Sequence, residues 1–137
     1  MEEKIKGRFI IQIAGKPVEN VEKALNVVLD KLKSEKENFK VLDSDIAEPE
    51  LDEESSLYSG FIDIELRFSD ISKLFGFIID YTPNSIEIED PEKITFTNSD
   101  LSNILNDVSH IVLGTQMQLR NLNAQVHMLN KKLEDKK

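Results

Sequence analysis

Apolar residues in the last quarter of the chain, from Ser99 to Lys137, recur at alternating intervals of four and three. This spacing is the heptad repeat of a coiled-coil helix, in which apolar side chains occupy positions a and d of every seven. The ten such positions, which we call the heptad seam, are Leu101, Leu105, Val108, Val112, Thr115, Leu119, Leu122, Val126, Leu129 and Leu133. Only Thr115 among them is polar. The pattern therefore predicts one long amphipathic helix, capped by Asn98 or Ser99.

The apolar stripe of this helix changes width near its middle. Ile104 and Ile111 occupy position g and broaden the face over 101–112, which suits packing in a core or in a bundle of several helices. The seam over 115–133 is narrow and suits a pair of helices. Gly114 beside Thr115 marks the least stable turn between the two parts.

A helix of about 36 residues would be roughly 54 Å long. A domain of ~100 residues has a radius of gyration near 13 Å, so the end of the helix would overhang it. We expect a second copy to cover the overhang, giving a homodimer or larger oligomer, with a helix of another protein as the alternative. The residues expected to hold the oligomer are Leu101, Ile104, Leu105, Val108, Ile111, Val112, Leu119, Leu122, Val126, Leu129 and Leu133. The flanking residues of the narrow part are nearly uncharged, so parallel and antiparallel pairing both stay open.

The first 98 residues alternate between strand and helix patterns. Strands are expected over 9–14, 39–42, 61–68 and 86–89, and helices over 17–35 and 71–79. The order β-α-β-β-α-β predicts a ferredoxin-like split βαβ domain, a four-stranded antiparallel sheet with both helices on one face. The chain then comprises an acidic α+β domain at 1–98 and an oligomerisation helix at 99–137.

Three local features of this domain lead to further expectations. Ser69 or Asp70 can cap the second helix, and Gly76 inside that helix suggests a close approach of a neighbouring element. Ile94 and Phe96 either add a short fifth strand or anchor the linker to the long helix.

Acidic residues are concentrated in the first 98 residues, which carry 22 acids and 12 bases, whereas 99–137 carries 4 acids and 5 bases. A surface for nucleic acid or for anionic lipid needs clustered cations, so neither is expected as a partner. The segment 43–54 holds seven carboxylates and no base, which predicts a solvated acidic loop.

The chain offers no recognisable cofactor or metal site. It has no cysteine and no apolar run of the ~20 residues that span a bilayer, and we expect a cytoplasmic protein. A calcium-loop template starting at Asp43 fails because Ala47 and Glu48 stand where a ligand and the turn glycine belong. His110 and His127 lie seventeen residues apart at solvent-facing helix positions, too far for a shared metal.

Catalytic motifs are equally lacking, and Gly15-Lys16 resembles a phosphate loop only superficially. Asp63 and Glu65 alternate with apolar residues on one strand, and paired carboxylates can act as acid and base, but a solvated sheet face gives the same pattern. We therefore expect no enzymatic activity. An exposed aromatic among charges can instead anchor a contact. The expected partner surface comprises Ile10, Phe61, Asp63, Glu65 and Arg67, with Leu42 adding apolar atoms.

Two functions of different kinds fit this pattern. The first is a self-associating adaptor or assembly protein that oligomerises through its terminal helix and presents the acidic domain to a protein partner. The alternative is a regulatory subunit that senses a small molecule at a site between protomers, lined by the exposed sheet face or by the helix containing Gly76. An enzyme working through Asp63 and Glu65 is a third and less favoured hypothesis.

Overall fold

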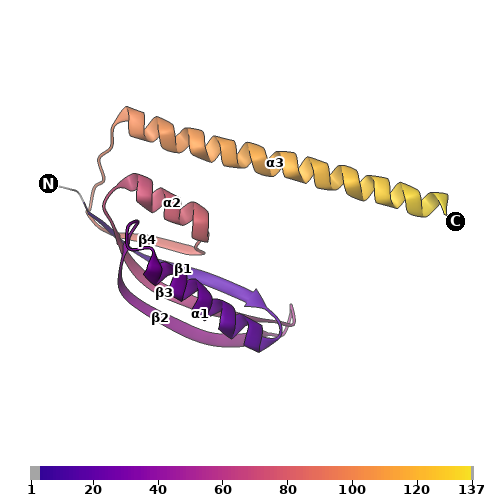
Figure 1. Ribbon diagram of the computed structural model, residues 1–137, viewed down its shortest axis with the longest axis horizontal. Coiled ribbons are helices and arrows are strands. Elements are labelled where there is room, and N and C mark those ends of the chain that lie inside the picture. The colour runs from indigo at the N-terminus through magenta and orange to yellow at the C-terminus, as the bar shows by residue number, and fades with distance from the viewer. Residues whose placement is uncertain (1–3, 137) are drawn as a thin grey trace. The chain divides into compact units, whose positions relative to one another are not determined.

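The computed structural model describes residues 4–136, and its internal contacts divide the chain into two units, which meet between Thr95 and Phe96 (Figure 1). The first unit is α+β and the second is a single long helix. The elements of the first unit are β1 (Ile5–Gly15), α1 (Val18–Ser34), β2 (Lys40–Asp52), β3 (Leu57–Phe68), α2 (Ile71–Tyr81) and β4 (Ser85–Asp90). The second unit contains α3 (Asn98–Asp135).

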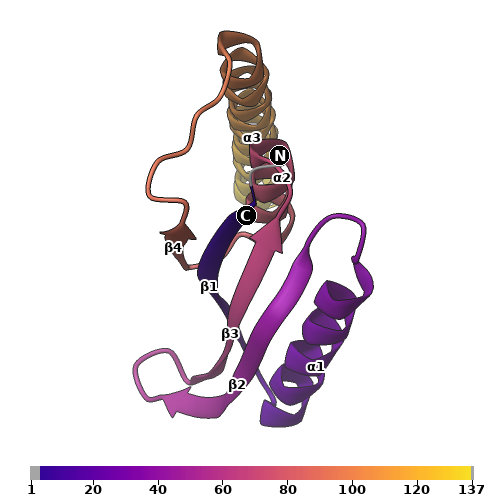
Figure 2. The same ribbon diagram turned by 90° about the vertical axis from the view of Figure 1, so that its left-hand side faces the viewer.

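The four strands form one antiparallel sheet in the order β2-β3-β1-β4, which Figure 2 shows. β1 lies at the centre and pairs with β3 along its whole length, from Ile5 opposite Phe68 to Gly15 opposite Tyr58. The prediction of an α+β chain with a four-stranded antiparallel sheet and a long terminal helix is confirmed.

One face of the sheet, the inner face, carries the hydrophobic core. Alternate residues of β1 and β3 point to this face, and both α1 and α2 pack against it. The apolar side chains of alternate strand residues pack here against the apolar faces of the two helices, as expected for an antiparallel sheet with one buried face. The core residues are Ile5, Phe9, Ile11, Val21, Leu25, Leu32, Phe39, Ile62, Ile64, Leu66, Phe68, Leu74 and Phe77.

Aromatic rings form the part of the core beneath α2. Phe9 meets Phe77 edge to face with 4.8 Å between ring centroids, and Phe39 lies 5.5 Å from Phe77. Phe68 contacts all three rings at 5.6 to 5.9 Å. Edge-to-face pairs of this kind contribute about 0.5–1.5 kcal/mol each beyond their buried area. The cluster ties β1, β3, α2 and the residue before β2 together.

The helix starts follow from side-chain caps. Asp70, one of the two expected candidates, caps α2: its Oδ1 accepts a hydrogen bond of 2.9 Å from the Lys73 N–H. The cap of α3 is Thr97, whose Oγ1 accepts from the Asp100 N–H at 3.1 Å. The expectation of Asn98 or Ser99 was therefore wrong by one or two residues, because threonine fills the same role one position earlier.

The acidic segment 43–54 is not a loop, so that prediction was wrong. β2 continues to Asp52, and the turn to β3 occupies 53–56. Ser44 and Ile46 pair with Ile64 and Ile62 and so take the inner face, while the carboxylates alternate with them toward water. An edge strand tolerates this charge because one side of it is solvated.

Two further local expectations concerned the segment after β4 and the glycine inside α2, and only the second was wrong. Ile94 and Phe96 form no fifth strand in the described part of the chain; Ile94 instead packs against the core, which was the anchoring alternative. A methyl group added at Gly76 would have no atom within 4 Å outside its own helix, so no close approach explains that glycine. A close approach does occur at Gly60, where a Cβ would lie 2.5 Å from Leu25 Cδ1 and 3.3 Å from the Ala47 carbonyl oxygen.

Polar contacts hold the α1–β2 connection, residues 35–39, onto α2. The Tyr81 hydroxyl donates to Glu35 Oε2, and Lys73 Nζ donates to the Glu37 carbonyl oxygen at 3.0 Å. Burial first, and then the hydrogen bond to Glu35 and its charge, raise the pKa of Tyr81 well above its usual value. Its hydroxyl therefore keeps its proton throughout the ordinary pH range.

Substitution of the two glycines should have opposite effects. Gly60→Ala should lower the free energy of unfolding by about 1–3 kcal/mol, because Leu25 is buried and cannot move freely away from the new methyl group. Gly76→Ala should raise it by about 0.5–1 kcal/mol, because alanine favours an unobstructed helix interior. Urea denaturation at equal protein concentration measures both, and two changes of the same sign would contradict the packing described.

Tyr81→Phe should lower the free energy of unfolding near neutral pH by about 1 kcal/mol through loss of the hydrogen bond to Glu35. A raised folded pKa means that this contribution is complete below the unfolded value of about 10 and is lost as the pH rises above it. The variant should therefore lose less stability than the native chain between neutral and alkaline pH. Tyr58→Phe is the control, since no hydrogen bond of its hydroxyl is found among the described residues.

Candidate functional site

The outer face of the sheet, opposite the core, carries the side chains expected to form a partner surface. Cross-strand pairing arranges them in rows that run from β2 through β3 to β1. The row nearest the start of β1 is Lys40, Arg67 and Lys6; the next is Asp43, Glu65 and Arg8; the third is Asp45, Asp63 and Ile10; the fourth is Ala47, Phe61 and Gln12. All five expected residues are therefore on this one face.

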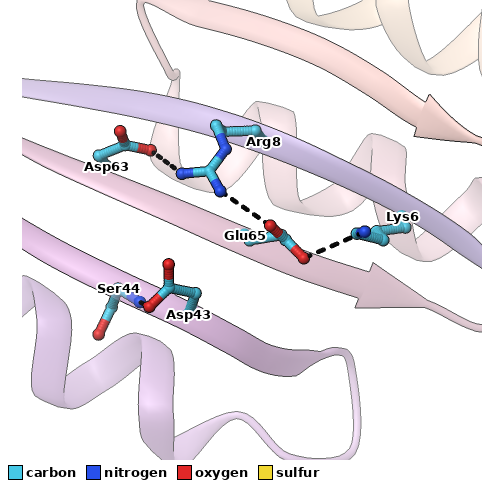
Figure 3. A network of polar contacts seen from close by, with 6 residues as sticks. All are labelled: Lys6, Arg8, Asp43, Ser44, Asp63 and Glu65. Atoms are coloured by element: carbon cyan, nitrogen blue, oxygen red, sulfur yellow. Dashed lines mark hydrogen bonds and ion pairs between the residues drawn. The ribbon is translucent and has the colours of Figure 1, made fainter.

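Ion pairs between β1 and β3 cross the middle of this face (Figure 3). Arg8 donates from Nη1 to Asp63 Oδ1 at 3.0 Å and from Nη2 to Glu65 Oε2 at 2.9 Å. Lys6 Nζ lies 3.4 Å from Glu65 Oε1. The hydrogen bond to Asp63, and then the charges of Asp63 and Glu65, raise the pKa of Arg8, which stays charged. Arg8 thus joins two carboxylates that would otherwise repel each other.

This arrangement does not give Asp63 and Glu65 the environment of a catalytic pair. Each carboxylate already accepts a hydrogen bond from Arg8, and the Asp63 side chain keeps 45% of its accessible surface. Both lie on the outer face of β3, where the Glu65 side chain keeps 16% of its accessible surface, and Arg67 belongs to a different row and makes no ion pair with them. The ion pairs hold β1 and β3 in register.

Apolar atoms on the outer face come mainly from two residues. Phe61 is 38% exposed, and Ile10 is half-buried one row away. Together they form a small apolar area beside the ion pairs.

A second exposed apolar area lies at the sheet edge. Ile86 and Ile88 of β4 pair with Phe9 and Gly7 and so share the inner face, but no contact of α2 with β4 covers them. They remain 46% and 38% exposed. Their alternation with Glu87 and Glu89 predicted the strand but not that its apolar side would stay uncovered.

The α3 helix exposes its apolar stripe from Leu105 to Leu133. None of its residues is buried, and it runs without interruption through Gly114 and Thr115. The Thr115 hydroxyl donates to the Ile111 carbonyl oxygen at 3.0 Å, so the polar seam residue is satisfied within the helix. Leu101 and Ile104 are half-buried, and the exposed members of the expected set are Leu105, Val108, Ile111, Val112, Leu119, Leu122, Val126, Leu129 and Leu133.

The remaining candidates carry no site in the structure. His110 and His127 are both exposed on α3, and residues 4–136 contain no group of histidine or carboxylate side chains placed to hold a metal ion. Within that same range, no helix is both long enough and apolar enough to cross a membrane.

Sequence reasoning missed Lys6 and Arg8, the basic partners of the outer-face carboxylates. Both precede the apolar alternation from which the first strand was predicted. The available signal was that Lys6, Arg8 and Ile10 follow one another at two-residue intervals, and Ile10 was assigned to the solvated face.

Like charges face each other between β2 and β3, where Asp45 lies opposite Asp63. Asp45→Asn should therefore raise the free energy of unfolding by about 0.5 kcal/mol. The gain should shrink at high salt, because exposed charges are screened. Glu50→Gln is the matched control, since it removes a carboxylate from the same strand opposite Ser59. Equal changes in the two variants, measured by urea denaturation, would show that cross-strand repulsion is not the cause.

Comparison with known proteins gives one match, which spans both units. No curated protein matches the chain, and no solved structure matches it either. The match to a protein family covers residues 6–137, from the second residue of β1 through α3. The sheet unit and the helix therefore lie within one family region, and the chain belongs to the MJ0538 family.

Proposed function

We propose that this chain is a self-associating adaptor or assembly protein, held in a homodimer or larger oligomer by α3. The observation that carries the proposal is the heptad seam: α3 has 38 residues, none of them buried. Leucines at a and d positions are more than half exposed, among them Leu119 at 54% and Leu129 at 59%. Full burial of such a side chain is worth about 1.5–3 kcal/mol, so a covering helix gains considerable free energy.

A second copy of the chain suits this seam because identical helices can pair without repulsion. In a parallel pair, positions e and g of one helix face those of the other, and like charges there would oppose self-association. The narrow part of the seam is flanked by uncharged amides and one cation. These flanking residues are Gln116, Gln118, Asn123, Gln125, Asn130 and Lys132. A helix of another protein is the second possible occupant.

The first unit is, in this proposal, a ferredoxin-like split βαβ domain presented by the oligomer. The order of elements and the strand order β2-β3-β1-β4 support that assignment. The surface offered to a protein partner is the outer face, where Phe61 and Ile10 lie beside the ion pairs of Arg8. The chain has no cysteine and so needs no oxidising compartment, which fits the cytoplasmic location we propose.

Two leucines on α3 provide a matched test. Leu119 lies in the seam at position a, whereas Leu113 lies outside it at position b, and their exposures are 54% and 53%. In the full chain, Leu119→Asn should raise the dissociation constant of the oligomer by about tenfold or more, because it places polar groups in the apolar contact. Leu113→Asn should leave it within about twofold. Light scattering coupled to size-exclusion chromatography, over a dilution series, measures both.

The outcomes of this experiment separate the two occupants of the seam. A native chain that stays monomeric at tens of micromolar concentration would contradict self-association through α3. Equal effects of the two leucine substitutions would show that the contact does not use the heptad seam. A chain ending after Gly114 should associate more weakly than the native chain, because it lacks the narrow part of the seam.

A further inference from the structure

Half of the basic residues in the first 98 residues surround one surface hollow, although this part of the chain is acidic. The hollow has two adjoining compartments of about 550 and 290 Å³, which share Lys36, Phe39 and Lys40. Among residues 4–98, six bases line it but only one acid, Glu37. We call it the cationic groove; its bases are Lys4, Lys33, Lys36, Lys40, Arg67 and Lys73.

Strand pairing forces some of these cations together. Lys40 of β2 lies directly opposite Arg67 of β3, and Arg67 lies directly opposite Lys6 of β1. Lys6 pairs with Glu65, but the ion pairs found among residues 4–136 do not include Lys40 or Arg67. Like charges directly opposite in a sheet are destabilising. A bound anion would turn this repulsion into attraction.

Packing and hydrogen bonds fix the backbone of residues 35–39, which forms part of the groove. Its floor includes Phe39, which is 5% exposed and packed into the aromatic cluster. The connection that carries Lys36 is fixed to α2 through Tyr81 and Glu35, and through Lys73 and the Glu37 carbonyl oxygen. A site whose backbone is already fixed loses little conformational entropy when a ligand binds.

The two compartments differ in character, and this indicates the chemistry of the ligand. The larger is lined by Phe39, Val41 and the aliphatic stems of lysines, so it suits an apolar or planar group. The smaller contains Arg67, Lys73 and Ser69, and an arginine fork with hydroxyl and ammonium donors suits a phosphate.

We propose that the cationic groove binds a small organic phosphate, with its phosphate at Lys40, Arg67 and Lys73 and its apolar part over Phe39. A nucleic-acid strand is a poorer fit, because the next two rows of the sheet carry Asp43 and Asp45 on β2 and would repel an extended polyanion. The groove is formed entirely by the first unit of a single chain, so ligand binding does not depend on self-association. This location differs from that of the small-molecule site between protomers, which was the alternative function suggested by the sequence.

Calorimetric titration of the full chain at low ionic strength tests the proposal, with pyrophosphate and a nucleoside triphosphate as probes. Both should bind, and the nucleotide should bind more tightly because its base can occupy the larger compartment. The double variant K40Q/R67Q should lower both affinities about tenfold or more, because charge-assisted hydrogen bonds are lost. K16Q/K23Q, which removes two exposed lysines outside the groove, should change them less than twofold.

Two controls keep the test independent of folding and of α3. Without ligand, the K40Q/R67Q variant should be at least as stable to urea as the native chain, because the substitutions remove a repulsive pair. If this variant fails to fold, Lys36→Gln on the exposed connection takes its place in the titration. Leu119→Asn should bind the probes as the native chain does. Absence of binding, equal losses in the two double variants, or tighter binding of a short oligonucleotide than of the nucleotide would each overturn the proposal.

Discussion

The alternation of side chains between the two faces of β1 and β3 is the constraint on which the first unit depends. Phe9 and Ile64 point into the core, while their neighbours Arg8 and Glu65 form an ion pair on the outer face. A slip of one residue in this pairing would bury charges and expose the aromatic cluster. The inner core and the outer ion pairs therefore specify the same register from opposite sides. That shared register also sets the rows that contain the residues of the proposed partner surface and of the proposed cationic groove.

Local periodicity was enough to predict most of the elements from the sequence. The alternation from Ile62 to Phe68 and the helical stripes gave the strands and helices to within a few residues, except at β2. There the strand pattern of Ser44 and Ile46 is weak, and the carboxylates between them suggested a loop. Pairing with β3 decides the conformation of that segment, and a pairing partner far away in the sequence cannot be read from local pattern. The long helix was easier to predict, because the ten positions of its seam follow one spacing rule along one continuous segment.

The candidate surfaces also differ in how far they could be predicted from local sequence. The α3 residues could be named from the sequence because a helix face is defined by its own spacing. The cationic groove could not, since its bases come from four separate stretches, around Lys4, Lys36, Arg67 and Lys73, and the overall acidity of the domain concealed them. Net charge excluded a broad basic surface, whereas local charge is set by which strand ends the fold brings together.

The acidic edge strands have a consequence for how copies of the protein can meet. β2 and β4 are the two open edges of the sheet, and they carry Glu48, Glu50, Glu87 and Glu89, with Pro49 interrupting one of them. Two copies that joined edge to edge would bring rows of carboxylates together and would lack a hydrogen-bond donor at the proline. The charges and the proline on the edge strands therefore disfavour edge-to-edge association of copies into a continuous sheet at neutral pH.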